Sequence, residues 1–125
     1  MNESLEHILT YDVLEHVPNV EFSSREFSRV LKPGGSLSIS VPFILGSDRS
    51  VRRASIADDG TIQHHAEPQY HGDPLSKSGI LCFHEFAWDM LDTIRACGFS
   101  SVQGYLFASR DFGYFGPNIT IEAIK

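Results

Sequence analysis

A tract of potential metal ligands lies in the middle of the chain. It reads His64-His65-Ala-Glu67 and is followed by Tyr70 and His71. Imidazole and carboxylate groups are suitable ligands for zinc or iron. Adjacent residues of an extended segment point to opposite sides, however, so His64 and His65 do not easily converge on one ion. We therefore expect no metal site, and we predict instead that Tyr70 and His71 contact a substrate.

Three arginines, Arg49, Arg52 and Arg53, precede this tract. A guanidinium group pairs well with carboxylate and phosphate oxygens. The arginines could therefore clamp an acidic acceptor such as a phosphorylated or carboxylated sugar, and Arg53 is our candidate for this role. Three cations on one loop are also what an ordinary solvated surface carries, and this second interpretation stays open.

A second group of candidate residues follows a short apolar run, Ile8–Val13, that is suited to a buried strand. It comprises Tyr11, Asp12 and His16, which lie at the carboxyl end of that strand, where α/β proteins bind ligands. An imidazole titrates near neutrality, so His16 could transfer a proton. Alternatively, Glu15 and His16 hydrogen-bond the following loop and cap the next helix, and we favour that structural role for Glu15.

The elements that position these residues alternate between strand and helix. Asn19 is a plausible N-cap, and the helix after it ends at Lys32-Pro33-Gly34-Gly35. Ser36–Phe43 alternates serine with apolar residues, which predicts a strand. A second helix is expected from His84 to Cys97, with its apolar face toward a core.

Two further strands are expected at the end of the chain, at Ser101–Ala108 and Asn118–Ile124. The short turn between them predicts an antiparallel pair, whereas the preceding alternation predicts a largely parallel sheet. Residues 44–82 are too long for a simple connection and are expected to form a lid or substrate insertion. Within it, Asp58-Asp59-Gly60 predicts the turn of a hairpin.

Composition limits the class of protein. The 125 residues include 10 Lys and Arg against 16 Asp and Glu, a net charge of −6, which argues against nucleic-acid binding. No apolar stretch is long enough to span a bilayer, and the first residues of the chain lack the pattern of a signal peptide. Cys82 and Cys97 form no disulfide framework and are interpreted as reduced, buried thiols. We expect a single cytoplasmic domain over residues 1–125 with no membrane partner.

Residues 11–43 resemble the type 11 group of class I S-adenosylmethionine-dependent methyltransferases. The resemblance rests on Tyr-Asp-Val-Leu-Glu-His-Val-Pro-Asn, on Arg-Val-Leu-Lys-Pro-Gly-Gly, and on the apolar strand that follows. Pro68–Pro74, Phe86–Leu91 and Gly98-Phe99 are similar to one branch of the same group. The resemblance implies an α/β fold: the C-terminal half of a Rossmann-like seven-stranded sheet, strands four to seven, with the last two antiparallel.

The resemblance also implies what to expect of the cofactor. Members of the family bind S-adenosylmethionine with a glycine-rich turn and an acidic residue on their first two strands, and neither precedes Tyr11 here. We expect half of the cofactor site to be missing from this chain, which alone would be inactive. Because strand one of the family lies beside strand four, we also expect Ile8–Val13 to be an open edge that promotes self-association, unless another polypeptide covers it.

Site roles follow from the same resemblance. Tyr11 and Asp12 are expected to bind the cofactor at its methionine end, and His16 is the candidate catalytic base. Tyr70, His71 and Arg53 are the candidate substrate ligands, and the family calls for no metal. The expected function is methyl transfer to a small acceptor, such as a sugar or another polar metabolite. The alternative is a non-catalytic, methyltransferase-like binding or scaffold subunit.

Overall fold

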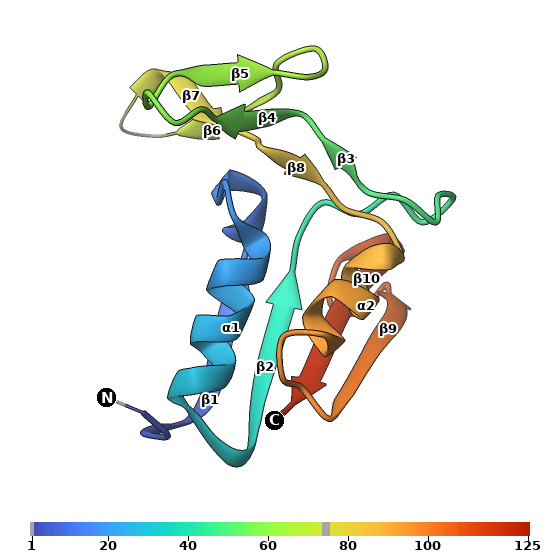
Figure 1. Ribbon diagram of the computed structural model, residues 1–125. Coiled ribbons are helices and arrows are strands. Elements are labelled where there is room, and N and C mark those ends of the chain that lie inside the picture. The colour runs from blue at the N-terminus through green and yellow to red at the C-terminus, as the bar shows by residue number, and fades with distance from the viewer. Residues whose placement is uncertain (1, 74–75) are drawn as a thin grey trace.

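A four-stranded mixed sheet forms the centre of the protein (Figure 1). The computed structural model describes residues 2–73 and 76–125. In the sheet the strands are ordered β1-β2-β10-β9. β1 and β2 are parallel, and β10 is antiparallel to both of its neighbours. The sheet strands are β1 (Leu5–Tyr11), β2 (Leu31–Ser40), β9 (Ser101–Ser109) and β10 (Tyr114–Ile124). The α/β class and the antiparallel last pair are confirmed, but only one of the three ladders is parallel.

Two helices cover one face of this sheet. They are α1 (Val20–Val30) and α2 (Asp89–Arg95), and a 3-10 turn, η1 (Leu14–His16), precedes them. Leu37 and Ile39 of β2 point toward the helices and are fully buried. They join one apolar core with residues of both helices and of β10. The helices therefore fix the sheet from a single side (Figure 1).

The opposite face of the sheet is polar along β2. Ser36, Ser38 and Ser40 alternate with the buried residues and are partly exposed. The Ser36 hydroxyl bonds His7 Nδ1 at 2.8 Å, and the Ser38 hydroxyl donates to the carboxylate of Glu122 at 2.7 Å. The serine–aliphatic alternation thus predicted the strand but not its bounds: Ser36–Phe43 was expected, and β2 is Leu31–Ser40.

The ends of α1 follow from local chemistry. Asn19 is the N-cap, and its side-chain oxygen accepts a hydrogen bond from the Phe22 N–H at 2.9 Å. The helix ends at Val30, and Leu31 already has extended backbone angles. The predicted cap and stop are therefore confirmed. Gly34 has φ +78°, a conformation that glycine adopts without strain.

The first strand is displaced from its predicted position. β1 begins at Leu5 and ends at Tyr11, because Asp12 turns the backbone into the left-handed region with φ 53°. β1 is an outer strand of the sheet, and several of its apolar side chains are exposed: Leu5 by 45%, Leu9 by 66% and Tyr11 by 53%. Ile8 on the other face packs against the core.

Residues 44–82, which we predict to be a lid or substrate insertion, contain short two-stranded units. β4 (Ala54–Ile56) pairs with β5 (Ile62–His64) in the expected antiparallel hairpin. β6 (Tyr70–Asp73) pairs with β7 (Ser76–Leu81) in a second hairpin that was not predicted. Both lie at the end of the sheet where β1 and β2 terminate (Figure 1). We call residues 51–85 the lid.

The second helix is shorter than its prediction. His84 and Glu85 form β8, which pairs with β3 (Val51–Arg52), so the helix begins only at Asp89. A ladder with a distant segment overrides the helical periodicity of residues 84–88. Met90 and Ile94 are buried as expected, and Gly98 has φ +100° after the helix.

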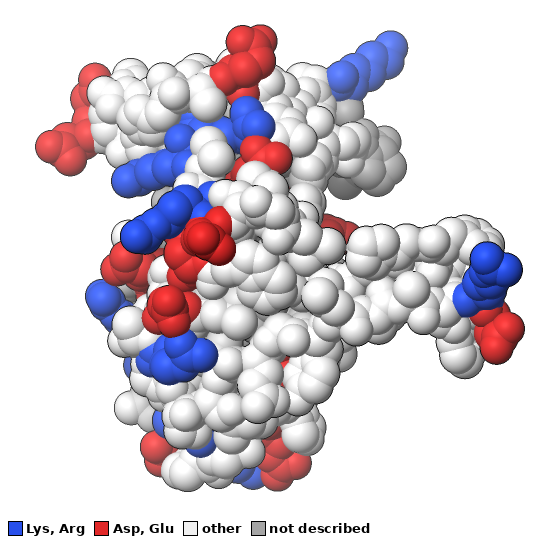
Figure 2. Space-filling model, turned by 90° about the vertical axis from the view of Figure 1, so that its right-hand side faces the viewer, with Lys and Arg blue, Asp and Glu red and all other residues white. Residues whose placement is uncertain are grey.

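The surface shows no separation of charge on the face seen in Figure 2, where basic and acidic side chains lie next to one another. At the far end of the β9–β10 pair, Phe112 and Phe115 are more than four-fifths exposed. Neither α1 nor α2 has the length and apolar character that a bilayer-crossing helix needs.

Candidate functional site

The turn after β1 carries the first predicted site residues. Tyr11 is the last residue of β1, and the Asp12 N–H donates to the Ser40 carbonyl at 2.8 Å, which closes the ladder with β2. The left-handed backbone at Asp12 then redirects the chain into η1. Both side chains are exposed at the carboxyl end of the sheet, where the prediction placed them.

Glu15 is the most unusual side chain of η1. It is 1% exposed, and both carboxylate oxygens are buried without a hydrogen-bond donor within the part of the chain that the structure describes. Its backbone carbonyl accepts from the Phe83 N–H at 2.7 Å, which ties η1 to the end of the lid. The expectation that its side chain bonds the following loop is wrong. Burial of a carboxylate without a hydrogen-bond partner is costly, so the groups nearest to its oxygens matter.

Two imidazoles approach the Glu15 carboxylate. Oε1 lies 3.4 Å from His71 Nδ1 and 3.8 Å from His16 Nε2. The two rings meet edge to face with centroids 4.9 Å apart. His16 Nδ1 lies 2.9 Å from the Leu81 carbonyl, which can only accept, so Nδ1 carries the proton and Nε2 has the free lone pair. The structure thus brings together two predicted site residues that are 55 positions apart.

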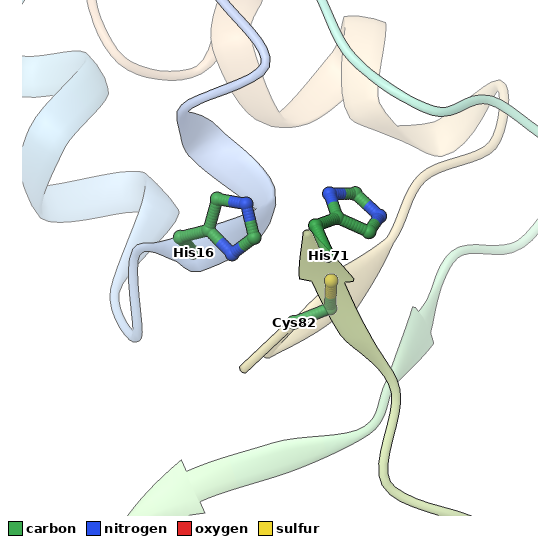
Figure 3. A group of neighbouring side chains, drawn as sticks. All are labelled: His16, His71 and Cys82. Atoms are coloured by element: carbon green, nitrogen blue, oxygen red, sulfur yellow. The ribbon is translucent and has the colours of Figure 1, made fainter. Parts of the chain in front are cut away.

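Cys82 completes this group. Its thiol is free and 1% exposed. Burial raises the pKa of this thiol, and the negative charge of Glu15 raises it further. Ligand atoms of His16, His71 and Cys82 lie within 4.8 Å of one another, and Figure 3 shows the sulfur directed toward the two rings. Sequence reasoning gave Cys82 only a structural role, because nothing in the linear spacing joins it to His16.

The remaining candidate substrate residues lie in the lid. Tyr70 is 54% exposed at the start of β6. Arg53 is already engaged: its guanidinium binds the Glu85 carboxylate, with Nε–Oε2 at 3.1 Å, and donates to the Glu67 carbonyl at 2.9 Å. Arg49 is exposed, and Arg52 lines a separate groove. The structure therefore gives Arg53 a role in holding the lid.

The His64-His65-x-Glu67 tract does not form a cluster in the structure. His64 is exposed on β5, and His65 Nε2 bonds the Ser55 hydroxyl at 2.8 Å.

A groove of about 370 Å³ lies on another part of the molecule. It is bounded by the start of α1, by α2 and by the β3–β8 pair. His84 is among its lining residues, and burial lowers the pKa of this imidazole. The His16–His71–Cys82 group does not line this groove, so the groove and the cluster are separate features.

Comparisons with known proteins identify the fold. Residues 1–39 match the family profile described as a methyltransferase domain. An S-adenosylmethionine-dependent methyltransferase from Mesorhizobium loti superposes with a TM-score of 0.62 at 15% identity, over 100% of this chain and 64% of that one. An S-adenosylmethionine-dependent methyltransferase from Methanosarcina mazei superposes with a TM-score of 0.53 at 17% identity. That superposition covers 99% of this chain and 60% of the other. A search of curated protein sequences found no match.

A third neighbour was solved with its ligands. This is 1,6-didemethyltoxoflavin-N1-methyltransferase from Burkholderia thailandensis, with bound 1,6-didemethyltoxoflavin and S-adenosylhomocysteine. The superposition has a TM-score of 0.59 at 16% sequence identity. It covers 100% of this chain and 45% of the neighbour. This chain thus spans less than two thirds of the length of each of these three proteins.

The chain therefore has the fold of a partial class I S-adenosylmethionine-dependent methyltransferase. The resemblance to the type 11 group, inferred from residues 11–43, is confirmed by the profile match to residues 1–39, and these structural neighbours share the fold. The expected cofactor, S-adenosylmethionine, is the one named for these neighbours.

Replacement of Arg53 by Lys tests its role in the lid. Lysine keeps the charge but loses the planar fork that reaches both Glu85 and the Glu67 carbonyl. We expect the hairpin to lose about 1 kcal/mol of local stability. Hydrogen exchange at the Ala57 and His65 amides, which bond within the lid, should quicken about fivefold.

The matched control is Arg49→Lys, which alters an exposed arginine of the same segment and should leave these amides unchanged. Equal exchange rates in both variants would show that Arg53 does not hold the lid.

Proposed function

We propose that this chain forms the acceptor-facing side of a methyl-transfer site that uses S-adenosylmethionine. The observation that carries the proposal is the position of the matched segment. Residues 1–39 match the methyltransferase domain and include Tyr11, Asp12 and His16. These three residues lie at the carboxyl end of β1, next to the lid, and α/β folds bind ligands at that edge.

The residues present fit one side of the cofactor. Tyr11 offers an exposed aromatic ring and Asp12 an exposed carboxylate. Both groups suit a ligand that carries a sulfonium cation and an amino group. When bound, S-adenosylmethionine supplies an activated methyl group and leaves as S-adenosylhomocysteine. The chain's own residues therefore need only to align the acceptor and manage its proton.

His16 is the proposed proton acceptor. Its Nδ1–H donates to the Leu81 carbonyl, so the lone pair of Nε2 is available. Its side chain is 16% exposed, which permits contact with a small molecule. An acceptor hydroxyl or amine that gains a methyl group would lose its proton to Nε2. The nearby Glu15 carboxylate would stabilise the resulting imidazolium.

The acceptor would enter beneath the lid. Tyr70 and His71 are partly exposed there and offer hydrogen bonds to a polar metabolite such as a sugar. Arg53 would contribute mainly by holding the lid through Glu85, and could reach an acidic acceptor only by releasing that partner. We place the protein in the cytoplasm, where Cys82 and Cys97 remain reduced, as free thiols.

S-adenosylhomocysteine should bind weakly, with a Kd well above micromolar, because the chain offers one wall of the site. Amide chemical-shift mapping during a titration tests this. We expect saturable shifts at the carboxyl ends of β1 and β2, and their loss in Tyr11→Ala. Tyr105→Ala, an exposed tyrosine on β9, is the control. Shifts confined to the groove between α1 and α2 would contradict the proposal, as would no shift at saturating ligand.

In a polypeptide that also carries the glycine-rich first half of the cofactor site, His16→Gln should lower the turnover number by about 10²-fold or more, because glutamine can still donate to the Leu81 carbonyl but cannot accept the proton. The assay is release of S-adenosylhomocysteine in the presence of carboxylated and phosphorylated sugars. The affinity for S-adenosylhomocysteine should stay unchanged. His7→Gln, which alters an exposed histidine on β1, should retain full turnover. Equal turnover of wild type and His16→Gln would remove His16 from the mechanism.

We further propose that the chain self-associates through β1. This outer strand exposes Leu5, Leu9 and Tyr11, and an open apolar edge favours pairing with another strand. Sedimentation velocity at a protein concentration of tens of micromolar should show a dimer or larger species. The Leu9→Lys substitution should shift the distribution toward monomer. Phe112→Lys, at an even more exposed apolar position away from β1, is the control. A monodisperse wild-type monomer would contradict this proposal.

A further inference from the structure

Three side chains from separate segments converge where the lid meets the sheet. His16 comes from η1, His71 from β6, and Cys82 directly follows β7. Their ligand atoms lie within 4.8 Å of one another (Figure 3). In tetrahedral zinc sites, bond lengths of about 2.0–2.3 Å place ligand atoms about 3.3–3.8 Å apart. Small side-chain movements would therefore bring these three atoms onto one ion.

The buried carboxylate of Glu15 is an independent indication of a cation. Both of its oxygens are buried and lack a hydrogen-bond donor in the described structure. Oε1 lies 3.4 Å from His71 Nδ1 and 3.8 Å from His16 Nε2, which are spacings expected between atoms that share a metal. A divalent ion would satisfy this carboxylate, and together with a Cys82 thiolate the site would be electrically neutral.

The surroundings already orient His16 as a ligand. Its Nδ1–H donates to the Leu81 carbonyl, so the lone pair of Nε2 is the one available to the cluster. Metal-bound histidines commonly donate their second N–H to a carbonyl or carboxylate in this way. The side chains of His16 and His71 are 16% and 30% exposed, which leaves a path for an ion from solvent.

We propose that His16, His71, Cys82 and Glu15 bind one Zn²⁺ ion. Two imidazoles, a thiolate and a carboxylate suit zinc in a tetrahedral arrangement. On binding, the Cys82 thiol releases its proton to solvent and the sulfur forms the bond to the metal. The ion would clamp the β6–β7 hairpin to η1. It would also occupy Nε2 of His16, so the loaded chain could not use that atom as a proton acceptor.

Metal titration of the purified full chain tests the site without reference to methyl transfer. Calorimetry should show one equivalent of Zn²⁺ bound. Co²⁺, used as a spectroscopic substitute, should give a thiolate-to-metal charge-transfer absorption. Cys82→Ser should abolish that absorption, and both Cys82→Ser and His71→Asn should weaken Zn²⁺ binding by more than about tenfold. Circular dichroism shows whether each variant retains the fold.

Matched controls separate this cluster from other ligands. Cys97→Ser alters the second buried free thiol, and His64→Gln alters the exposed histidine of the His-His-x-Glu tract. Both should bind Zn²⁺ as the wild type does. The proposal is overturned if wild type binds no equivalent of Zn²⁺, if the charge-transfer band persists in Cys82→Ser, or if His64→Gln alone removes binding. Failure of the methyl-transfer assays would leave these readouts unaffected.

Discussion

β1 and β2 are paired in parallel from His7 and Ser36 to Tyr11 and Ser40, and the Asp12 N–H adds a final bond to the Ser40 carbonyl. This ladder ends both strands at the same edge of the sheet. The left-handed backbone of Asp12 then carries the chain directly into η1. Every feature of the candidate site depends on this geometry, because η1 supplies both Glu15 and His16, and its buried Leu14 anchors the turn in the core.

Local patterns predicted the elements whose stability comes from nearby residues. The serine–aliphatic alternation predicted a strand at β2, and Asn19 predicted the start of α1. Asp58-Asp59-Gly60 predicted the turn between β4 and β5. The error at the second helix lies where a distant segment competes with local preference. His84 and Glu85 join a two-residue ladder with β3 instead of extending α2, and no local pattern marks that partner.

The candidate site was predictable only in part for the same reason. The motif around Tyr11 and His16 identified the sheet edge, and the histidine-rich lid identified His71. Their proximity depends on how the β6–β7 hairpin lies against η1, which the sequence does not state. Cys82 was interpreted as a buried thiol, and it is one. What the linear order concealed is that ligand atoms of Cys82, His16 and His71 lie within 4.8 Å of one another.

Glu15 therefore links folding to chemistry. Its backbone carbonyl holds Phe83 at the end of the lid, while its carboxylate is buried without a hydrogen-bond donor in the described residues and lies close to His71 and His16. The proposed ion would place positive charge beside this carboxylate. It would also engage Cys82 and fix the β6–β7 hairpin to η1. Occupation of this one cluster by an ion would thus decide whether the lid is held rigidly and whether His16 Nε2 is free to accept a proton.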